Sequence, residues 1–142
     1  MTTTARMPAS RLSTPTHLLL LIAGAIVALG VNTGLAYAAL ALGAEPAFAP
    51  LTIVAFGPFT VIGFFAAYAG WRIVRARATR PAALLRVLVP VLTVLSFTPD
   101  VVLLVTGFIP GVSLIGGLAL ALMHLVVVGA VLLVAARVAP VR

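Results

Sequence analysis

Four polar side chains within long apolar runs of this 142-residue chain could form a site that handles protons or binds a ligand: Asp100, His124, Asn32 and Ser96. An ionisable residue inside a membrane-spanning segment costs about 2.5–3.5 kcal/mol on insertion scales, so such residues usually face protein or water. We therefore treat these four residues as a candidate intramembrane polar cluster.

The segment before Asp100 is expected to be bent and polar. Thr93, Ser96 and Asp100 are spaced at i, i+3 and i+7, which places them on one face of a helix. Pro99 has no N–H to donate to the carbonyl of Leu95, so that acceptor is freed about one turn below Asp100. Water or a protonated side chain could occupy this position.

Asp100 has two possible states. As a carboxylate it needs a cation, and His124 is the ionisable partner in the same part of the layer. As a neutral acid it could donate a hydrogen bond to Asn32, Ser96 or a backbone carbonyl.

Depth counting weakens the case for a direct bond. At about 1.5 Å per residue, Asp100 lies roughly 10 Å below the outer turn, His124 roughly 18 Å and Asn32 about 15 Å. The difference of about 8 Å between Asp100 and His124 argues against contact unless a tilt or kink closes it, and a water bridge is an equal alternative. The cluster could serve a proton relay or a ligand, or it could only fix the register of the helices.

Other chemistries find no support in the sequence. The chain has no Cys, which excludes thiolate sites, and His17 and His124 lie at depths too different for a metal cluster or a haem. There is no glycine-rich phosphate loop. Ser96 or Ser113 could be combined with His124 and Asp100 into a triad, but nothing in the spacing demands it. We therefore expect no enzyme, no cofactor and no metal.

Composition indicates the elements that carry these residues. Hydrophobic residues make up 63% of the chain and charged residues 8%, whereas a soluble domain is nearer half apolar and a quarter charged. A water-soluble monomer is thereby excluded. At roughly 20 apolar residues per crossing, the length leaves room for about four membrane helices.

The predicted fold is all-α, a bundle of four transmembrane helices. The helices are expected at about residues 18–42, 49–71, 82–106 and 112–136. Residues 1–16 form an N-terminal tail, 17–137 the membrane domain and 138–142 a C-terminal tail. Pro58, Pro90 and Pro99 fall inside the helices and are expected to kink them.

The distribution of arginine predicts the orientation. All nine basic residues are Arg, with two in the N-terminal tail, five in the region 72–86 and two at the C-terminus, and none in the turns 43–50 and 107–112. The positive-inside rule then places both termini in the cytoplasm of a bacterium, with the chain in the inner membrane. The basic loop between the second and third helices comprises Arg72, Arg75, Arg77 and Arg80.

Two alternatives follow from the same residues. A net charge of +7 would indicate nucleic acid in a soluble protein, but here the Arg residues flank apolar runs, so we expect the lipid bilayer and not nucleic acid as partner. The first helix could be a signal peptide cleaved after Ala-Tyr-Ala (36–38) or Ala-Phe-Ala (47–49). Its run of about 25 apolar residues exceeds the ~7–15 of a signal core, which favours a retained helix.

Stripes of small residues predict close packing, because helices in lipid associate by close backbone approach and polar contacts. The stripes are Ala25, Ala28, Asn32, Ala36 and Ala39; Gly30 and Gly34; Thr60, Gly63, Ala67 and Gly70; and Gly117, Ala121 and His124. They fit a compact bundle that packs with itself or with another membrane protein.

Two short motifs carry a resemblance. Ser-Phe-Thr-Pro-Asp-Val (96–101) and Met-His-Leu-Val (123–126), in a chain with four helices, resemble a family of small actinobacterial integral membrane proteins of unknown function. The resemblance covers about residues 15–137 and implies fold and location but no catalytic residues. Small multidrug exporters share the helix count, yet they place an acid in the first helix, where this chain has Asn32.

Two functions remain open. The first is a structural or accessory protein that packs with itself or a membrane partner through its small-residue faces. The second is a small transporter or proton-coupled subunit that uses Asp100, His124 and Asn32.

Overall fold

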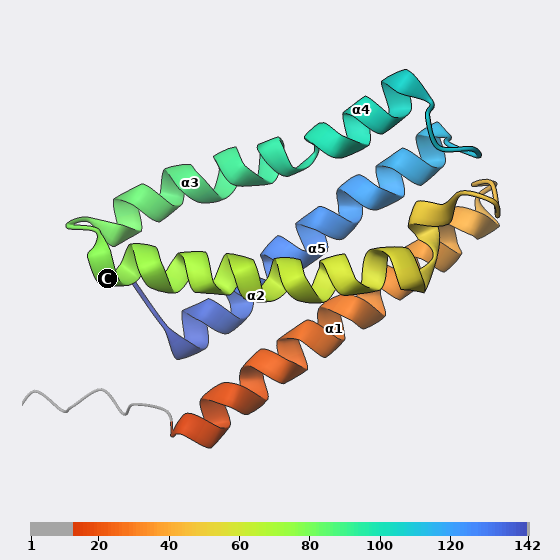
Figure 1. Ribbon diagram of the computed structural model, residues 1–142. Coiled ribbons are helices and arrows are strands. Elements are labelled where there is room, and N and C mark those ends of the chain that lie inside the picture. The colour runs from red at the N-terminus through yellow and green to blue at the C-terminus, as the bar shows by residue number, and fades with distance from the viewer. Residues whose placement is uncertain (1–12, 142) are drawn as a thin grey trace, which may run out of the picture.

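The computed structural model describes residues 13–141, which over that range form helices and short connections without a strand. The elements are α1 (Thr14–Ala41), the 3₁₀-helix η1 (Ala49–Leu51), α2 (Ile53–Arg77), α3 (Pro81–Ser96), α4 (Thr98–Thr106) and α5 (Leu114–Val138) (Figure 1). Since α3 and α4 follow one another as a single span, the described chain has four segments long and apolar enough to cross a membrane. The predicted number of spans is confirmed.

Two helices begin at other residues than predicted. α1 starts at Thr14 and not at residue 18, with a proline in its first turn, where no backbone N–H is required. α2 starts at Ile53 and not at residue 49, because residues Ala49–Leu51 form a separate 3₁₀ turn and Thr52 is extended. Residues 1–12 of the predicted N-terminal tail lie outside the described residues.

The predicted basic loop is largely helical, so that prediction was wrong. α2 continues to Arg77 and includes Arg72 and Arg75, while Arg80 lies in the short connection before Pro81. Arginine is a good helix former, and its long side chain can carry the charge away from apolar surroundings. A run of charge therefore marks the membrane boundary without ending the helix.

The three predicted kink sites behave differently. α2 runs unbroken through Pro58, and α3 runs unbroken through Pro90. A break occurs at Phe97, and Pro99 occupies the first turn of the following helix, α4. The missing N–H of Pro99 therefore falls at a position where a helix needs none.

The small-residue stripe of α1 forms its buried face. The buried residues of this helix are Ala25, Ala28, Asn32, Ala36 and Ala39, which confirms the predicted stripe. Through this face α1 packs mainly against α5, and the two helices run side by side in Figure 1. Gly30 and Gly34 lie on an exposed face, where an added Cβ would meet no atom within 4 Å.

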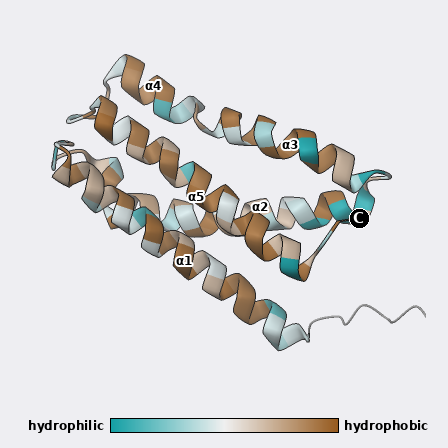
Figure 2. Cartoon of the chain, turned by 180° about the vertical axis from the view of Figure 1, so that it is seen from behind, coloured by the Kyte–Doolittle hydropathy of each residue, from teal (hydrophilic) through white to brown (hydrophobic). Residues whose placement is uncertain are grey.

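The outward faces of the bundle are apolar. Large side chains such as Ile26, Val54 and Val105 are exposed, and hydrophobic residues cover all four spans in Figure 2. A bilayer solvates such a surface, whereas water does not. These four apolar spans indicate a multi-pass membrane protein.

The described basic residues gather at one end of the bundle. The start of α1, the connection between α2 and α3 and the end of α5 lie at this end, and the Glu45 loop lies at the other (Figure 1). Trp71 of α2 donates its indole N–H to the carbonyl of Ala139 at 3.0 Å, and Ala139 is buried. The predicted C-terminal tail is thus anchored at its beginning.

Candidate functional site

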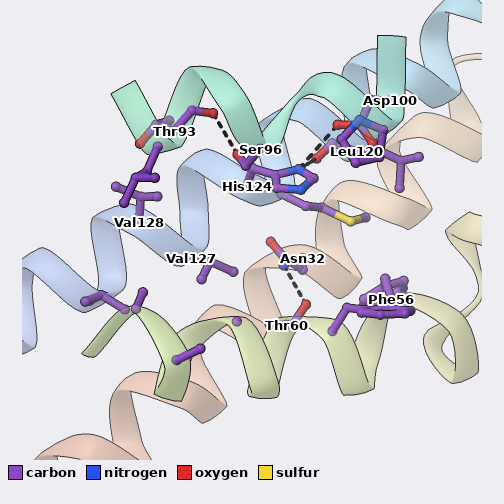
Figure 3. Close-up of a pocket in the computed structure, with 18 of the residues that line it drawn as sticks. Asn32, Phe56, Thr60, Thr93, Ser96, Asp100, Leu120, His124, Val127 and Val128 are labelled. Atoms are coloured by element: carbon purple, nitrogen blue, oxygen red, sulfur yellow. Dashed lines mark hydrogen bonds and ion pairs between the residues drawn. The ribbon is translucent and has the colours of Figure 1, made fainter. Parts of the chain in front are cut away.

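A groove of about 860 Å³ runs between α2, α3, α4 and α5 (Figure 3). This volume lies within the range of about 300–1,000 Å³ that is usual for small-molecule sites. The groove opens between α2 and α3, because Phe59 on α2 and Leu92 on α3 both line it and are 77% and 57% exposed. Its walls are mainly apolar, with a few polar side chains that include all four residues of the predicted cluster, Asp100, His124, Asn32 and Ser96.

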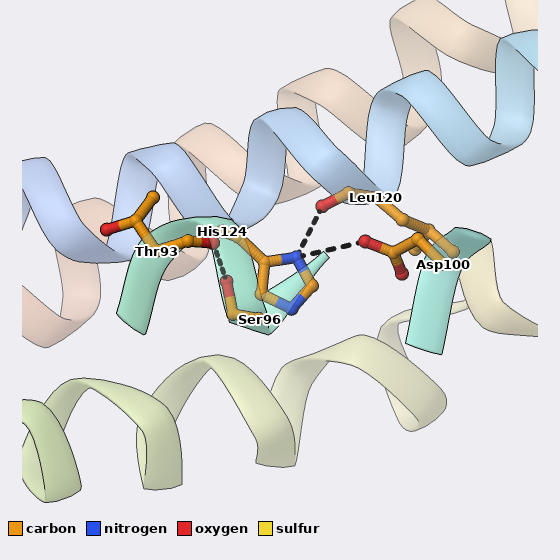
Figure 4. A network of polar contacts seen from close by, with 5 residues as sticks. All are labelled: Thr93, Ser96, Asp100, Leu120 and His124. Atoms are coloured by element: carbon orange, nitrogen blue, oxygen red, sulfur yellow. Dashed lines mark hydrogen bonds and ion pairs between the residues drawn. The ribbon is translucent and has the colours of Figure 1, made fainter. Parts of the chain in front are cut away.

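Asp100 and His124 are the ionisable side chains among the described residues that line this groove. The Nδ1 atom of His124 lies 3.4 Å from Oδ2 of Asp100 (Figure 4). The His124 side chain is 36% exposed and that of Asp100 is 10% exposed. The imidazole therefore faces the groove, while the carboxylate lies largely behind it.

Depth counting argued against contact between these two residues unless a tilt or kink closes the difference, and the structure brings them together beside such a break. The break at Phe97, two residues before the predicted kink site Pro99, divides residues 82–106 into α3 and α4. The Phe97 ring also contacts the His124 ring edge to face, with ring centres 6.0 Å apart. The break thus places an aromatic side chain beside the imidazole, close to where Asp100 meets it.

The hydrogen bonds of His124 define its tautomer. Nδ1 lies 2.9 Å from the carbonyl oxygen of Leu120, and a carbonyl only accepts, so Nδ1 carries the hydrogen in this bond. The 3.4 Å contact with Asp100 is then electrostatic, and Oδ2 of Asp100 has no hydrogen-bond donor among the described residues. In Figure 4 the other ring nitrogen, Nε2, points away from both partners toward α2.

Asn32 lies at the same groove but does not bind Asp100. Its side chain is 1% exposed, and Nδ2 donates to Oγ1 of Thr60 on α2 at 2.9 Å. Its carbonyl oxygen Oδ1 has no donor among the described residues. Sequence reasoning assigned Thr60 only to a packing stripe, and the signal it missed is that both Asn32 and Thr60 are polar members of small-residue faces.

The hydroxyls on α3 serve its own backbone. Ser96 donates to the carbonyl of Thr93 at 2.7 Å, and Thr93 donates to the carbonyl of Val89 at 2.7 Å. Both residues line the groove together with Asp100, as the predicted shared face requires. Because each hydroxyl hydrogen is already used, neither residue is a free donor toward the groove.

The remaining charged groups lie away from the pair. Arg86 lines a smaller pocket beside Trp71, at the end of the bundle where the arginines gather. The predicted basic residues Arg72, Arg75, Arg77 and Arg80 do not line the groove. Across residues 13–141, no three His, Asp or Glu side chains are grouped so that they could hold a metal ion.

The site therefore combines an acid, an imidazole and a buried amide at the wall of an apolar groove. Such an arrangement can bind a polar group in apolar surroundings and can gain or lose a proton. Comparison of the chain with models of protein families, with curated proteins and with solved structures finds no match. The resemblance to the small actinobacterial membrane proteins stays a prediction, and the function has to be inferred from the groove.

Proposed function

We propose that this protein is a small transporter, or a proton-coupled subunit of one, that binds its ligand in the groove at Asp100 and His124. The observation that carries the proposal is the convergence of these two ionisable side chains, 3.4 Å apart, on an open apolar groove. A pair that served only to fix the register of the helices would need no groove beside it, because it could do so when fully buried between packed helices. An intramembrane ionisable group that faces a cavity is typical of ligand paths and proton relays.

Proton coupling follows from the charges of the pair. When His124 is protonated, it compensates the carboxylate of Asp100, and when it is neutral, one negative charge remains at the groove wall. Charges interact strongly in apolar surroundings, so the binding of a polar or charged ligand depends on which state is present. Arg86 lines the smaller pocket that shares Trp71 and Leu85 with the groove, and Glu45 lies in the loop at the opposite end of the bundle. Neither residue lines the groove.

The proposed location is the bacterial inner membrane, with both termini and the α2–α3 connection in the cytoplasm. All nine basic residues of the chain are Arg and fall on the cytoplasmic side in this orientation, and Glu45 falls on the outer side. The positive-inside rule supports this choice over its inverse.

The experiment uses proteoliposomes that contain a trapped pH-sensitive dye. Apolar compounds that end in an ammonium, an alcohol or a carboxylate are added outside, and the internal pH is followed. We expect at least one compound to cause a proton movement that Asp100→Asn abolishes and that Ala67→Phe blocks by filling the groove.

Glu45→Gln is the matched control, because Glu45 is the other acid of the chain and does not line the groove. It should leave the proton movement unchanged. If no compound moves protons and the Ala67→Phe variant behaves as the original protein does, the transport proposal is wrong.

A second candidate function is a structural or accessory role through self-association. The exposed face with Gly30 and Gly34 favours it, since two glycines four residues apart allow close helix contact and nothing in the described chain covers them. Gly30→Leu should then abolish association measured by energy transfer between labelled copies in vesicles. Asp100→Asn should leave that association intact.

A further inference from the structure

We infer that the ligand of this groove is an organic cation that carries N–H donors on an apolar body, such as a protonated primary amine. This inference rests on the proposed function and specifies the chemical class of its ligand. Three properties of the groove lead to it: its buried unpaired polar atoms are acceptors, its charge is negative when Asp100 is a carboxylate and His124 is neutral, and its walls are apolar.

Most of the donors at the groove are already used. Nδ2 of Asn32 donates to Thr60, and Nδ1 of His124 donates to the Leu120 carbonyl. The hydroxyls of Ser96 and Thr93 donate to backbone carbonyls of α3. The donors that remain are the hydroxyl hydrogen of Thr60 and the second amide hydrogen of Asn32, both neutral and on buried residues. A carboxylate or a phosphate would therefore find no charged donor at this position.

The acceptors, in contrast, are left over. Oδ1 of Asn32 and Oδ2 of Asp100 are both buried and lack a hydrogen-bond donor among residues 13–141. When His124 is neutral with its hydrogen on Nδ1, its Nε2 is a third acceptor. Buried polar groups are rarely left without a partner, so the two buried oxygens indicate that a donor comes from outside the chain.

The charge of the site selects a cation. As a carboxylate, Asp100 supplies one negative charge, and neutral His124 supplies none. Arg86 precedes Asp100 by fourteen residues in the sequence. This separation corresponds to roughly 20 Å along a helix, so the Arg86 guanidinium cannot neutralise the Asp100 carboxylate directly. Protonation of His124 restores neutrality at the site, so a proton on His124 and a cation beside Asp100 compete.

The groove also accounts for the apolar body. Val127 and Val131 of α5 line it opposite Ala66 and Ala67 of α2, and these walls offer contact without hydrogen bonds. The two buried oxygens lie beneath the accessible surface at its floor. A ligand ammonium reaches the Asp100 carboxylate when the partly exposed His124 ring turns aside.

The test uses four compounds with one body: phenylbutylammonium, its N-trimethyl derivative, phenylbutanol and phenylbutanoate. Their binding to the protein in lipid nanodiscs is measured by equilibrium dialysis, with empty nanodiscs subtracted. We expect saturable binding of the primary ammonium, about tenfold or more weaker binding of the trimethyl derivative, which has the charge but no donor, and no saturable binding of the carboxylate.

Three variants make the result interpretable. Asp100→Asn should weaken the binding of the primary ammonium about tenfold or more, so that the ammonium no longer binds more tightly than the alcohol. Glu45→Gln should leave the affinities for both compounds unchanged. If the carboxylate or the alcohol binds best and Ala67→Phe prevents that binding, the groove is a ligand site but the cation inference is wrong. If none of the four compounds binds more tightly than to the Ala67→Phe variant, both the inference and the proposed function are overturned.

Discussion

His124 holds the polar site together because its ring contacts three parts of the chain. It donates to Leu120 on its own helix, lies 3.4 Å from Asp100 on α4 and packs against Phe97 at the break between α3 and α4. A side chain that contacts both halves of a broken helix stabilises the position of each. The imidazole is therefore structural as well as a candidate proton carrier.

Removing the imidazole should cost more than removing both members of the pair. His124→Ala leaves the largely buried Asp100 side chain without its imidazole partner, and we expect a loss of unfolding free energy of about 1–3 kcal/mol. Combining it with Asp100→Asn should recover part of that loss, because the uncompensated charge is gone. Thermal unfolding in detergent, followed by circular dichroism, measures both variants and the single Asp100→Asn change.

Equal destabilisation in the single and double variants would show that the charge of Asp100 is not compensated by His124. Ser96→Ala serves as the control, because its hydroxyl bonds only to the backbone of its own helix. That variant should unfold within a few degrees of the original protein.

The residue types of the site are predictable from sequence, whereas their pairing is not. Asp100, His124 and Asn32 are identifiable because a polar side chain within a membrane-spanning segment costs free energy, and such residues usually have a structural or functional role. Their partners depend on where the helices bend and rotate. The Asp100–His124 contact requires the break at Phe97, and the Asn32–Thr60 bond requires α1 and α2 to face each other through their small-residue stripes.

At the scale of single helices, α1 shows how a stripe of small residues specifies packing. Gly24 lies where an added Cβ would come within 2.7 Å of Val134 and 2.9 Å of Phe64, both buried. Gly30, six residues further along the same helix, would place a Cβ in open space. The same amino acid is therefore required in one position and incidental in the other.

The two glycines give a matched pair of variants. Gly24→Ala should lower the unfolding free energy by about 1–3 kcal/mol, because the new methyl group overpacks the contact with α2 and α5. Gly30→Ala should be neutral or slightly stabilising, since alanine is the better helix former by up to about 1 kcal/mol. Chemical unfolding of both variants in mixed micelles gives the comparison, and similar losses in both would contradict the packing.

Helix faces are predictable here and helix ends are less so, for a physical reason. The buried face of α1 follows from a 3.6-residue period that any observer can count. The ends of α1 and α2 depend on local backbone choices, such as the 3₁₀ turn at Ala49–Leu51 and the continuation of α2 through three arginines. Neither the 3₁₀ turn nor the continuation of α2 changes the hydrophobic pattern, so the pattern predicts neither of them.

For the molecule as a whole, the one-sided distribution of arginine is the basis of the orientation. The chain has no cysteine, so single cysteines can be introduced without background. Thr79→Cys lies in the exposed α2–α3 connection and Ala47→Cys in the exposed opposite loop. In intact cells a membrane-impermeant maleimide should label residue 47 and not residue 79.

Membrane disruption should make residue 79 reactive and leave the labelling of residue 47 unchanged. The reverse pattern in intact cells would place the termini outside and reject the proposed orientation. The four-span architecture itself would survive that result, because it follows from the length and hydropathy of the helices.

The bond between Trp71 and the Ala139 carbonyl gives this protein an intrinsic optical reporter. Trp71 is the sole tryptophan, and it lines the groove near the end of the bundle where the arginines gather. Its indole N–H donates to the carbonyl of Ala139, the residue directly after α5. Its emission spectrum should therefore shift to the red when a fusion partner pulls the C-terminus away from α2. A tag placed at the N-terminus should leave the emission spectrum of Trp71 unchanged. That spectrum could then report the binding of a ligand in the groove.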